Sequence, residues 1–126
     1  MNITLRLLKI ELKVNLYNQR RKVMKKRFYI YPYGYEFFIK TSSEKEIEKL
    51  YKGGKAVYDP EKRTLFYIPT IWNPWMCAHE CFHIMSDIMT VRGLDWVADM
   101  NNEHLAYLLQ DIHEQIWKAT KGNKDA

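Results

Sequence analysis

The sequence predicts an α+β fold in which a small, mostly antiparallel sheet packs against two helices. Two segments rich in aromatic and β-branched residues, 27–40 and 55–69, contain central turn-forming residues and indicate two β-hairpins. Two longer segments, 73–93 and 101–122, begin with helix-capping residues and end in glycine. Since 126 residues at 47% hydrophobic content suffice for one modest core, we expect residues 1–126 to form a single domain.

The N-terminal segment, residues 1–27, is strongly basic. It contains nine Lys or Arg residues and one acidic residue, Glu11, which gives +8, whereas the rest of the chain sums to −3. Apolar and polar residues alternate over 8–16, which favours a strand within 3–17; a helix with one leucine-rich face is the alternative. Residues 6–27 are the candidate contact for nucleic acid or an acidic partner, and a solvated turn is the alternative.

A hairpin and a short helix follow the basic segment. Pro32 and Gly34 divide 27–40 into two short strands. Ser43, with Glu46 three residues later, forms a capping box, which predicts a helix that ends at the next Gly-Gly pair.

A second hairpin occupies residues 55–69. Asp59 and Pro60 start its turn, and Pro69 ends its second strand. Together, the two hairpins would supply the strands of the sheet.

The first long helix carries a His-Glu-x-x-His motif. Asn73 can cap this helix, Pro74 occupies its first position, and Gly93 lies beyond its last turn. These signals place the helix and the second long helix, which Asn101 or Asn102 caps, within residues 73–122.

The motif has the spacing of a zinc site. His79 and His83 are four residues apart, so their rings lie on one face and can hold one ion. Glu80 is rotated by about 100° from His79, which places it where the base for a metal-bound water belongs. Two histidines that fall on one helix by chance are the alternative.

A catalytic zinc normally has three protein ligands, so a third must be sought. Ser86 and Met89 stand where the metzincin pattern requires Gly and His, which excludes that class. Asp87 is too far from His79, at about 12 Å along the helix axis. Glu103, in the first turn of the second helix, would face the pair if the two helices are antiparallel. Other residues that could complete the site are Asp95, Asp99 and His113.

The sequence HECFH, followed by NEHLA with 19 residues between His83 and Glu103, resembles the gluzincin class of zinc metallopeptidases. It is also similar to small phage and prophage proteins that carry an A-H-E-x-x-H helix and a later N-E-x-x-A-Y-L helix. The resemblance covers roughly residues 55–118. It implies a minimal zincin-like fold with Zn²⁺ bound by His79, His83 and Glu103, and Glu80 as the general base.

The resemblance implies a small zinc-dependent hydrolase, and the activity that we expect is that of a peptidase. Its oxyanion donor would be Tyr107 or His113, the nearest candidates in the sequence. The strand TLFYIP, residues 64–69, would be the sheet edge that binds an extended peptide beside the metal. One departure is that Tyr107 stands where thermolysin-like enzymes have an Asp that supports a ligand histidine. The alternative is a phage accessory protein that has a structural or vestigial zinc site and functions by binding a host protein or nucleic acid.

Two observations predict a cytoplasmic location, that of a phage-infected bacterial host if the resemblance holds. No run of about 18 apolar residues is present, so we expect no membrane span. Cys77 and Cys81 are four apart in a predicted helix, where a disulfide fits poorly, so we expect free thiols.

Overall fold

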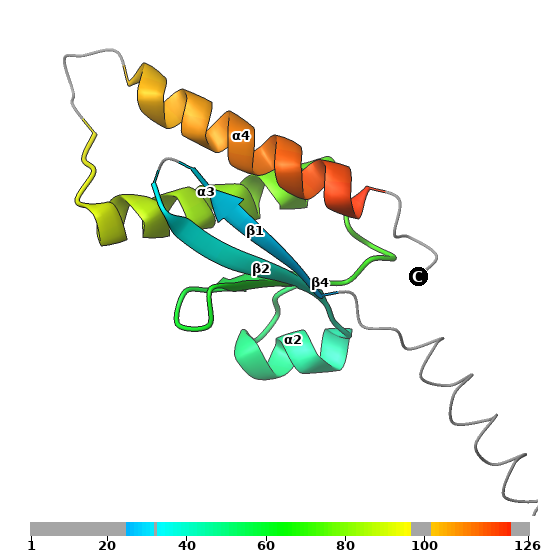
Figure 1. Ribbon diagram of the computed structural model, residues 1–126. Helices are drawn as coiled ribbons and strands as arrows, with labels where there is room; N and C mark the ends of the chain where they lie inside the picture. The colour runs from blue at the N-terminus through cyan, green and yellow to red at the C-terminus, as the bar shows by residue number, and fades with distance from the viewer. Residues whose placement is uncertain (1–24, 32, 97–101, 122–126) are drawn as a thin grey trace, which may run out of the picture.

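The computed structural model describes residues 25–31, 33–96 and 102–121. Over these residues the fold is α+β, with one four-stranded mixed sheet and three helices (Figure 1). The elements in chain order are β1 (Lys25–Ile30), β2 (Tyr35–Thr41), α2 (Glu44–Leu50), β3 (Ala56–Asp59), β4 (Thr64–Tyr67), α3 (Pro74–Arg92) and α4 (Glu103–Thr120). The predicted fold class is confirmed at this level, while the predicted strand at 3–17 lies outside the described residues.

The sheet joins the two predicted hairpins side by side. Its strand order is β1-β2-β4-β3, with antiparallel pairing inside each hairpin and parallel pairing between β2 and β4. The expectation that residues 64–69 form the edge strand is therefore wrong. Parallel pairing with β2 places β4 inside the sheet, where all four of its residues are buried, and β3 lies at the edge.

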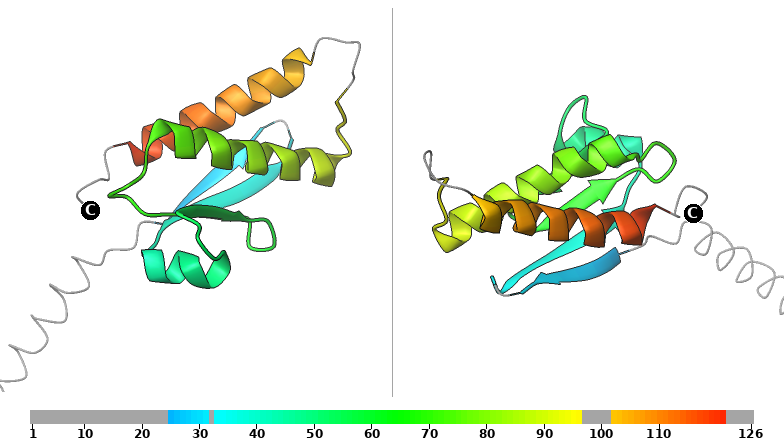
Figure 2. Two further views of the ribbon diagram at one scale, coloured as in Figure 1. Left: turned by 180° about the vertical axis from the view of Figure 1, so that it is seen from behind. Right: turned by 90° about the horizontal axis from the view of Figure 1, so that it is seen from above.

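The helices occupy both faces of the sheet. Helices α3 and α4 cover one face and run in opposite directions, while α2 lies on the other side near β3 (Figures 1 and 2). Burial follows this arrangement along β2, where Tyr35, Phe37 and Ile39 are fully buried and the alternate residues are partly exposed. None of the described helices combines the length and the apolar composition that a membrane crossing requires.

The predicted start signals of α3 and α2 act as expected, whereas Asn102 forms no side-chain capping bond at the start of α4, and α2 ends at Leu50, before the predicted Gly-Gly pair. The Met76 N–H donates to the Asn73 side chain over 2.9 Å at the start of α3, and Gly93 ends this helix with φ at 66°. The Glu46 N–H donates to Ser43 Oγ over 3.2 Å at the start of α2, which confirms the capping interaction.

The core lies between the sheet and the helix pair α3–α4. Phe28 and Phe37 stack with ring centroids 5.2 Å apart at the centre of the first hairpin. At the other end of the core, Trp72 Nε1 donates to Thr120 Oγ1 over 2.8 Å, which ties the loop before α3 to the end of α4. This bond fixes the start of α3, the helix that carries the His-Glu-x-x-His motif.

Both cysteines belong to this core. Cys77 and Cys81 are free thiols, as expected, and both are buried, with their sulfur atoms 3.9 Å apart. The hydrogen bond with Cys77 and burial both raise the pKa of the Cys81 thiol. The two cysteines therefore contribute packing at the base of α3 and are unsuited to act as nucleophiles.

Candidate metal centre

The two histidines of the motif lie side by side on the surface of α3. Their Nε2 atoms are 3.2 Å apart, and their ring centroids are separated by 4.9 Å. Two nitrogens bound to one tetrahedral zinc, each at about 2.0–2.1 Å, lie about 3.3 Å from each other. His79 and His83 thus already have the separation that two ligands of one zinc ion require.

Glu80 lies beside this pair with its side chain buried. Among the described residues, Glu80 Oε2 is the one buried side-chain oxygen or nitrogen that has no hydrogen-bond partner. Burial raises the pKa of Glu80, while the two imidazoles and the backbone N–H of Tyr58 act in the opposite direction. A buried oxygen without a partner is costly, and such atoms mark places where a water, an ion or a ligand belongs.

The three motif residues open into a groove between α3 and β3. Two adjacent pockets, of about 270 and 360 Å³, share four lining residues and together make up the space beside the motif. We call this space the α3–β3 groove; its shared residues are Tyr51, Ala56, His79 and Glu80. His83, Val57 and Tyr58 line one end, and the exposed Trp75 lines the other.

A chain of hydrogen bonds fixes the strand side of this groove. Tyr35 on β2 donates its hydroxyl to Asp87 on α3, so Tyr58 on β3 must donate to the Tyr35 hydroxyl. Asp87 lies one helical turn beyond His83, and the chain therefore links β2 and β3 to the helix face that carries the histidines. Burial raises the pKa of Tyr58 to about 12, and it raises the pKa of Tyr35 still further above its ordinary range.

The hydrogen bonds that join Tyr58, Tyr35 and Asp87 should make the stability of the folded protein fall at alkaline pH. The folded pKa of Tyr58 is about 12 against an ordinary value of 10.0, so the folded state holds this proton more tightly than the unfolded state does. The corresponding stabilisation is complete below pH 10.0 and is lost as the pH rises toward about 12. Urea denaturation at several alkaline pH values should show a smaller loss of stability in Tyr58→Phe than in the unmodified protein.

The matched control is Tyr107→Phe, which alters an exposed tyrosine on α4. This substitution should leave the loss of stability at alkaline pH unchanged. If Tyr58→Phe and the unmodified protein lose the same amount of stability at alkaline pH, the buried hydrogen bond of Tyr58 to Tyr35 would be contradicted.

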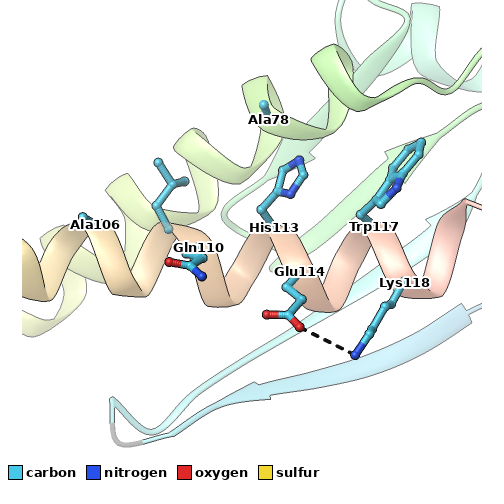
Figure 3. Close-up of a pocket in the computed structure, with 8 residues that line it drawn as sticks. Ala78, Ala106, Gln110, His113, Glu114, Trp117 and Lys118 are labelled. Atoms are coloured by element: carbon cyan, nitrogen blue, oxygen red, sulfur yellow. Dashed lines mark ion pairs between the residues drawn. The ribbon is translucent and has the colours of Figure 1, made fainter.

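The other candidate residues lie on α4, along a different flank of α3. A cavity of about 590 Å³ between the two helices is lined by Ala78 from α3 and by His113 and Trp117 from α4 (Figure 3). Tyr107 is 65% exposed on α4 and, like His113, is absent from the lining of the α3–β3 groove. Neither residue is therefore placed to donate to an oxyanion formed beside Glu80.

Glu103 is the first residue of α4, where its side chain is exposed. It precedes His113 by ten residues, about 15 Å of helix axis, and His113 faces the Ala78 flank of α3. The helices are antiparallel as expected, but α4 packs on the flank of α3 that does not carry the histidine pair. The described arrangement therefore does not bring Glu103 together with His79 and His83.

Within the described ranges, no group of three or more His, Cys, Asp or Glu side chains is arranged to hold a metal ion. Asp95, in the loop after α3, is exposed, and Asp99 lies outside the described residues. The structure brings His79, His83 and Glu80 together on α3, and a zinc site completed by Glu103 stays a prediction from the resemblance.

The sequence does not predict the contribution of β3 and its preceding loop. Tyr51 and Trp75 are exposed aromatic residues that line the α3–β3 groove, and Tyr58 forms its wall. Trp75 precedes His79 by one helical turn, a spacing that places both on one face and could have indicated its position.

Comparisons with protein-family models, with curated proteins and with solved structures find no match for this chain. The class of site is therefore argued from the geometry of the motif and of the α3–β3 groove.

Proposed function

We propose that the protein is a small zinc-dependent hydrolase that cleaves a peptide bond in an extended peptide. One observation carries this proposal: His79 Nε2 and His83 Nε2 are 3.2 Å apart, beside the buried carboxylate of Glu80 with its unpaired oxygen. Imidazole nitrogens at this separation suit zinc, and a carboxylate at this position of the motif suits a general base.

The roles of the residues follow from their positions. His79 and His83 would hold the ion, and the bound zinc would supply Lewis acidity that acidifies a water and polarises the scissile carbonyl. Glu80 Oε2 accepts the proton of the attacking water, since it has no partner among the described residues. The backbone N–H of Tyr58 orients the carboxylate, and burial raises its pKa, which makes it a stronger base.

The α3–β3 groove supports a peptide as the substrate. Strand β3 is at the edge of the sheet, and a peptide can pair with the backbone of an edge strand. Such a peptide would pass in front of His79 and Glu80 toward Trp75 and Tyr51, whose exposed rings offer apolar contacts at that end of the groove.

Metal content tests the proposal most directly. Protein purified without chelators should contain one zinc ion per chain by elemental analysis, and His79→Ala should contain none. His113→Ala, which changes a histidine of the α3–α4 cavity, is the matched control and should keep its zinc. Protein that contains no zinc and takes up none when zinc is added would overturn the proposal.

The third ligand is tested separately, by zinc titration of Glu103→Ala beside His104→Ala. Ligation by Glu103 predicts a sharp loss of zinc affinity in the first variant alone, because a carboxylate supplies both a ligand and a compensating charge. The described arrangement predicts equal affinity in both variants. Equal affinity would remove Glu103 from the ligand set and leave the roles of His79 and His83 intact.

A further inference from the structure

A second surface, with cationic and aromatic side chains, lies on the side of the sheet opposite α3 and α4. Helix α2 packs near β3 on this side (Figure 2). The outward residues of β1 are exposed there, and those of β2 are partly exposed. Alternate residues of β1 point outward there, because Phe28 and Ile30 between them are buried in the core. We define the β1–β2 outer face by six residues: Lys25, Arg27, Tyr29, Glu36, Phe38 and Lys40.

Positive charge is concentrated on this face. Lys25 and Lys40 are direct partners in the pairing of β1 with β2, and like charges in directly opposite positions destabilise a sheet. Within the described part of the chain, the ion pair formed on this face joins Arg27 to Glu36 over 2.7 Å. The face thus carries three cations and one anion, and Arg20, Arg21 and Lys22 lie three to five residues before Lys25 in the sequence.

Aromatic rings lie among these cations. Tyr29 is 49% exposed, and Tyr31, just after β1, is 81% exposed. The ammonium group of Lys25 lies 4.9 Å from the centroid of the Phe38 ring. Residues on one face of a strand repeat about every 6.7 Å, so cations and rings form a regular row along β1.

We propose that the β1–β2 outer face binds single-stranded nucleic acid. Cations that track the phosphates, together with rings on which bases stack, are the two components of sequence-tolerant single-strand binding. An acidic protein would use the cations but would leave the exposed rings of Tyr29 and Tyr31 without a function. A duplex keeps its bases stacked inside, where these rings cannot reach them. This inference is independent of the proposed zinc site.

Fluorescence anisotropy with a labelled oligothymidine of about 12 nucleotides, within the site sizes known for single-strand binding folds, tests the proposal on the full chain. Tyr29→Ala and Tyr31→Ala should each weaken binding about five-fold or more, because each removes a stacking surface. The control Tyr107→Ala removes a tyrosine from α4 whose exposure, 65%, lies between those of Tyr29 and Tyr31, and it should leave affinity unchanged. Circular dichroism checks that each variant is folded.

The cations are tested through the dependence of affinity on salt. Lys25→Gln combined with Lys40→Gln should reduce the slope of log affinity against log salt by about 1.4, since each phosphate contact on a single strand contributes about 0.7. Lys45→Gln combined with Lys49→Gln removes the same charge from α2 and should leave the slope unchanged.

Three results would overturn the proposal. One is equal binding of a duplex of the same length. Another is equal weakening by the β1–β2 and α2 lysine variants, which would show that only net charge matters. The third is unchanged affinity in both tyrosine variants together with full competition by an oligoglutamate peptide, which would assign the surface to an acidic protein.

Discussion

Under the proposed function, replacing Glu80 with glutamine should abolish peptide hydrolysis while zinc stays bound. Glutamine has nearly the same shape but cannot accept a proton from water, and loss of a general base lowers kcat by about 100- to 10,000-fold. The measurement is the rate of new amine release from a peptide mixture, with zinc content determined on the same samples. Glu114→Gln, which neutralises an exposed carboxylate on α4, is the matched control and should hydrolyse at the unmodified rate.

The stability of Glu80→Gln shows whether the role of Glu80 is catalytic or structural. Burial disfavours the charged form of this carboxylate, and one of its oxygens lacks a partner, so the side chain adds little to the folded state. The urea midpoint of metal-free Glu80→Gln should equal or exceed that of the unmodified protein. Unchanged hydrolysis combined with a large loss of stability would show that Glu80 has a structural role.

Replacing Phe37 with alanine should cause the largest loss of stability among single substitutions in the sheet. Phe37 is fully buried on β2 and stacks on Phe28, so its removal leaves a cavity that the two packed layers cannot close. Losses of about 3–5 kcal/mol are typical of such changes. Urea denaturation followed by circular dichroism measures the free energy of unfolding.

Phe82→Ala is the matched control for this experiment. It makes the same chemical change on α3, where Phe82 is 49% exposed. Its effect should stay below about 1 kcal/mol, as for most surface substitutions. Similar losses for Phe37→Ala and Phe82→Ala would contradict the position of the core between the sheet and α3.

Local signals in the sequence predict much of this fold because they act over a few residues. Asn73, Pro74 and Gly93 bound α3 through capping and backbone preferences that need no tertiary partner. The turn signals likewise predict both hairpins. The order of the strands does not follow from such signals, because the parallel contact of β2 with β4 joins residues from different hairpins. For that reason the edge position was assigned to the wrong strand.

The candidate site was predictable only in part, for a similar reason. The spacing of His79, Glu80 and His83 fixes their mutual positions on one helix, whatever packs around it. The wall of the site depends on which strand lies beside that helix, so the contributions of Tyr58 and Tyr51 could not be predicted. The position of Glu103 depends on the flank of α3 against which α4 packs, and helix periodicity does not determine that choice.

The parallel pairing of β2 with β4 also has a consequence for the order of folding. Each hairpin can close through contacts between neighbours in the sequence, whereas this pairing brings Phe38 beside Thr64 across α2 and β3. Closing so long a loop costs chain entropy before its contacts form, which slows the step. We infer that the hairpins form early and that their joining limits the folding rate. The α3–β3 groove, which needs β3 anchored to the sheet, would then be among the last parts to assemble.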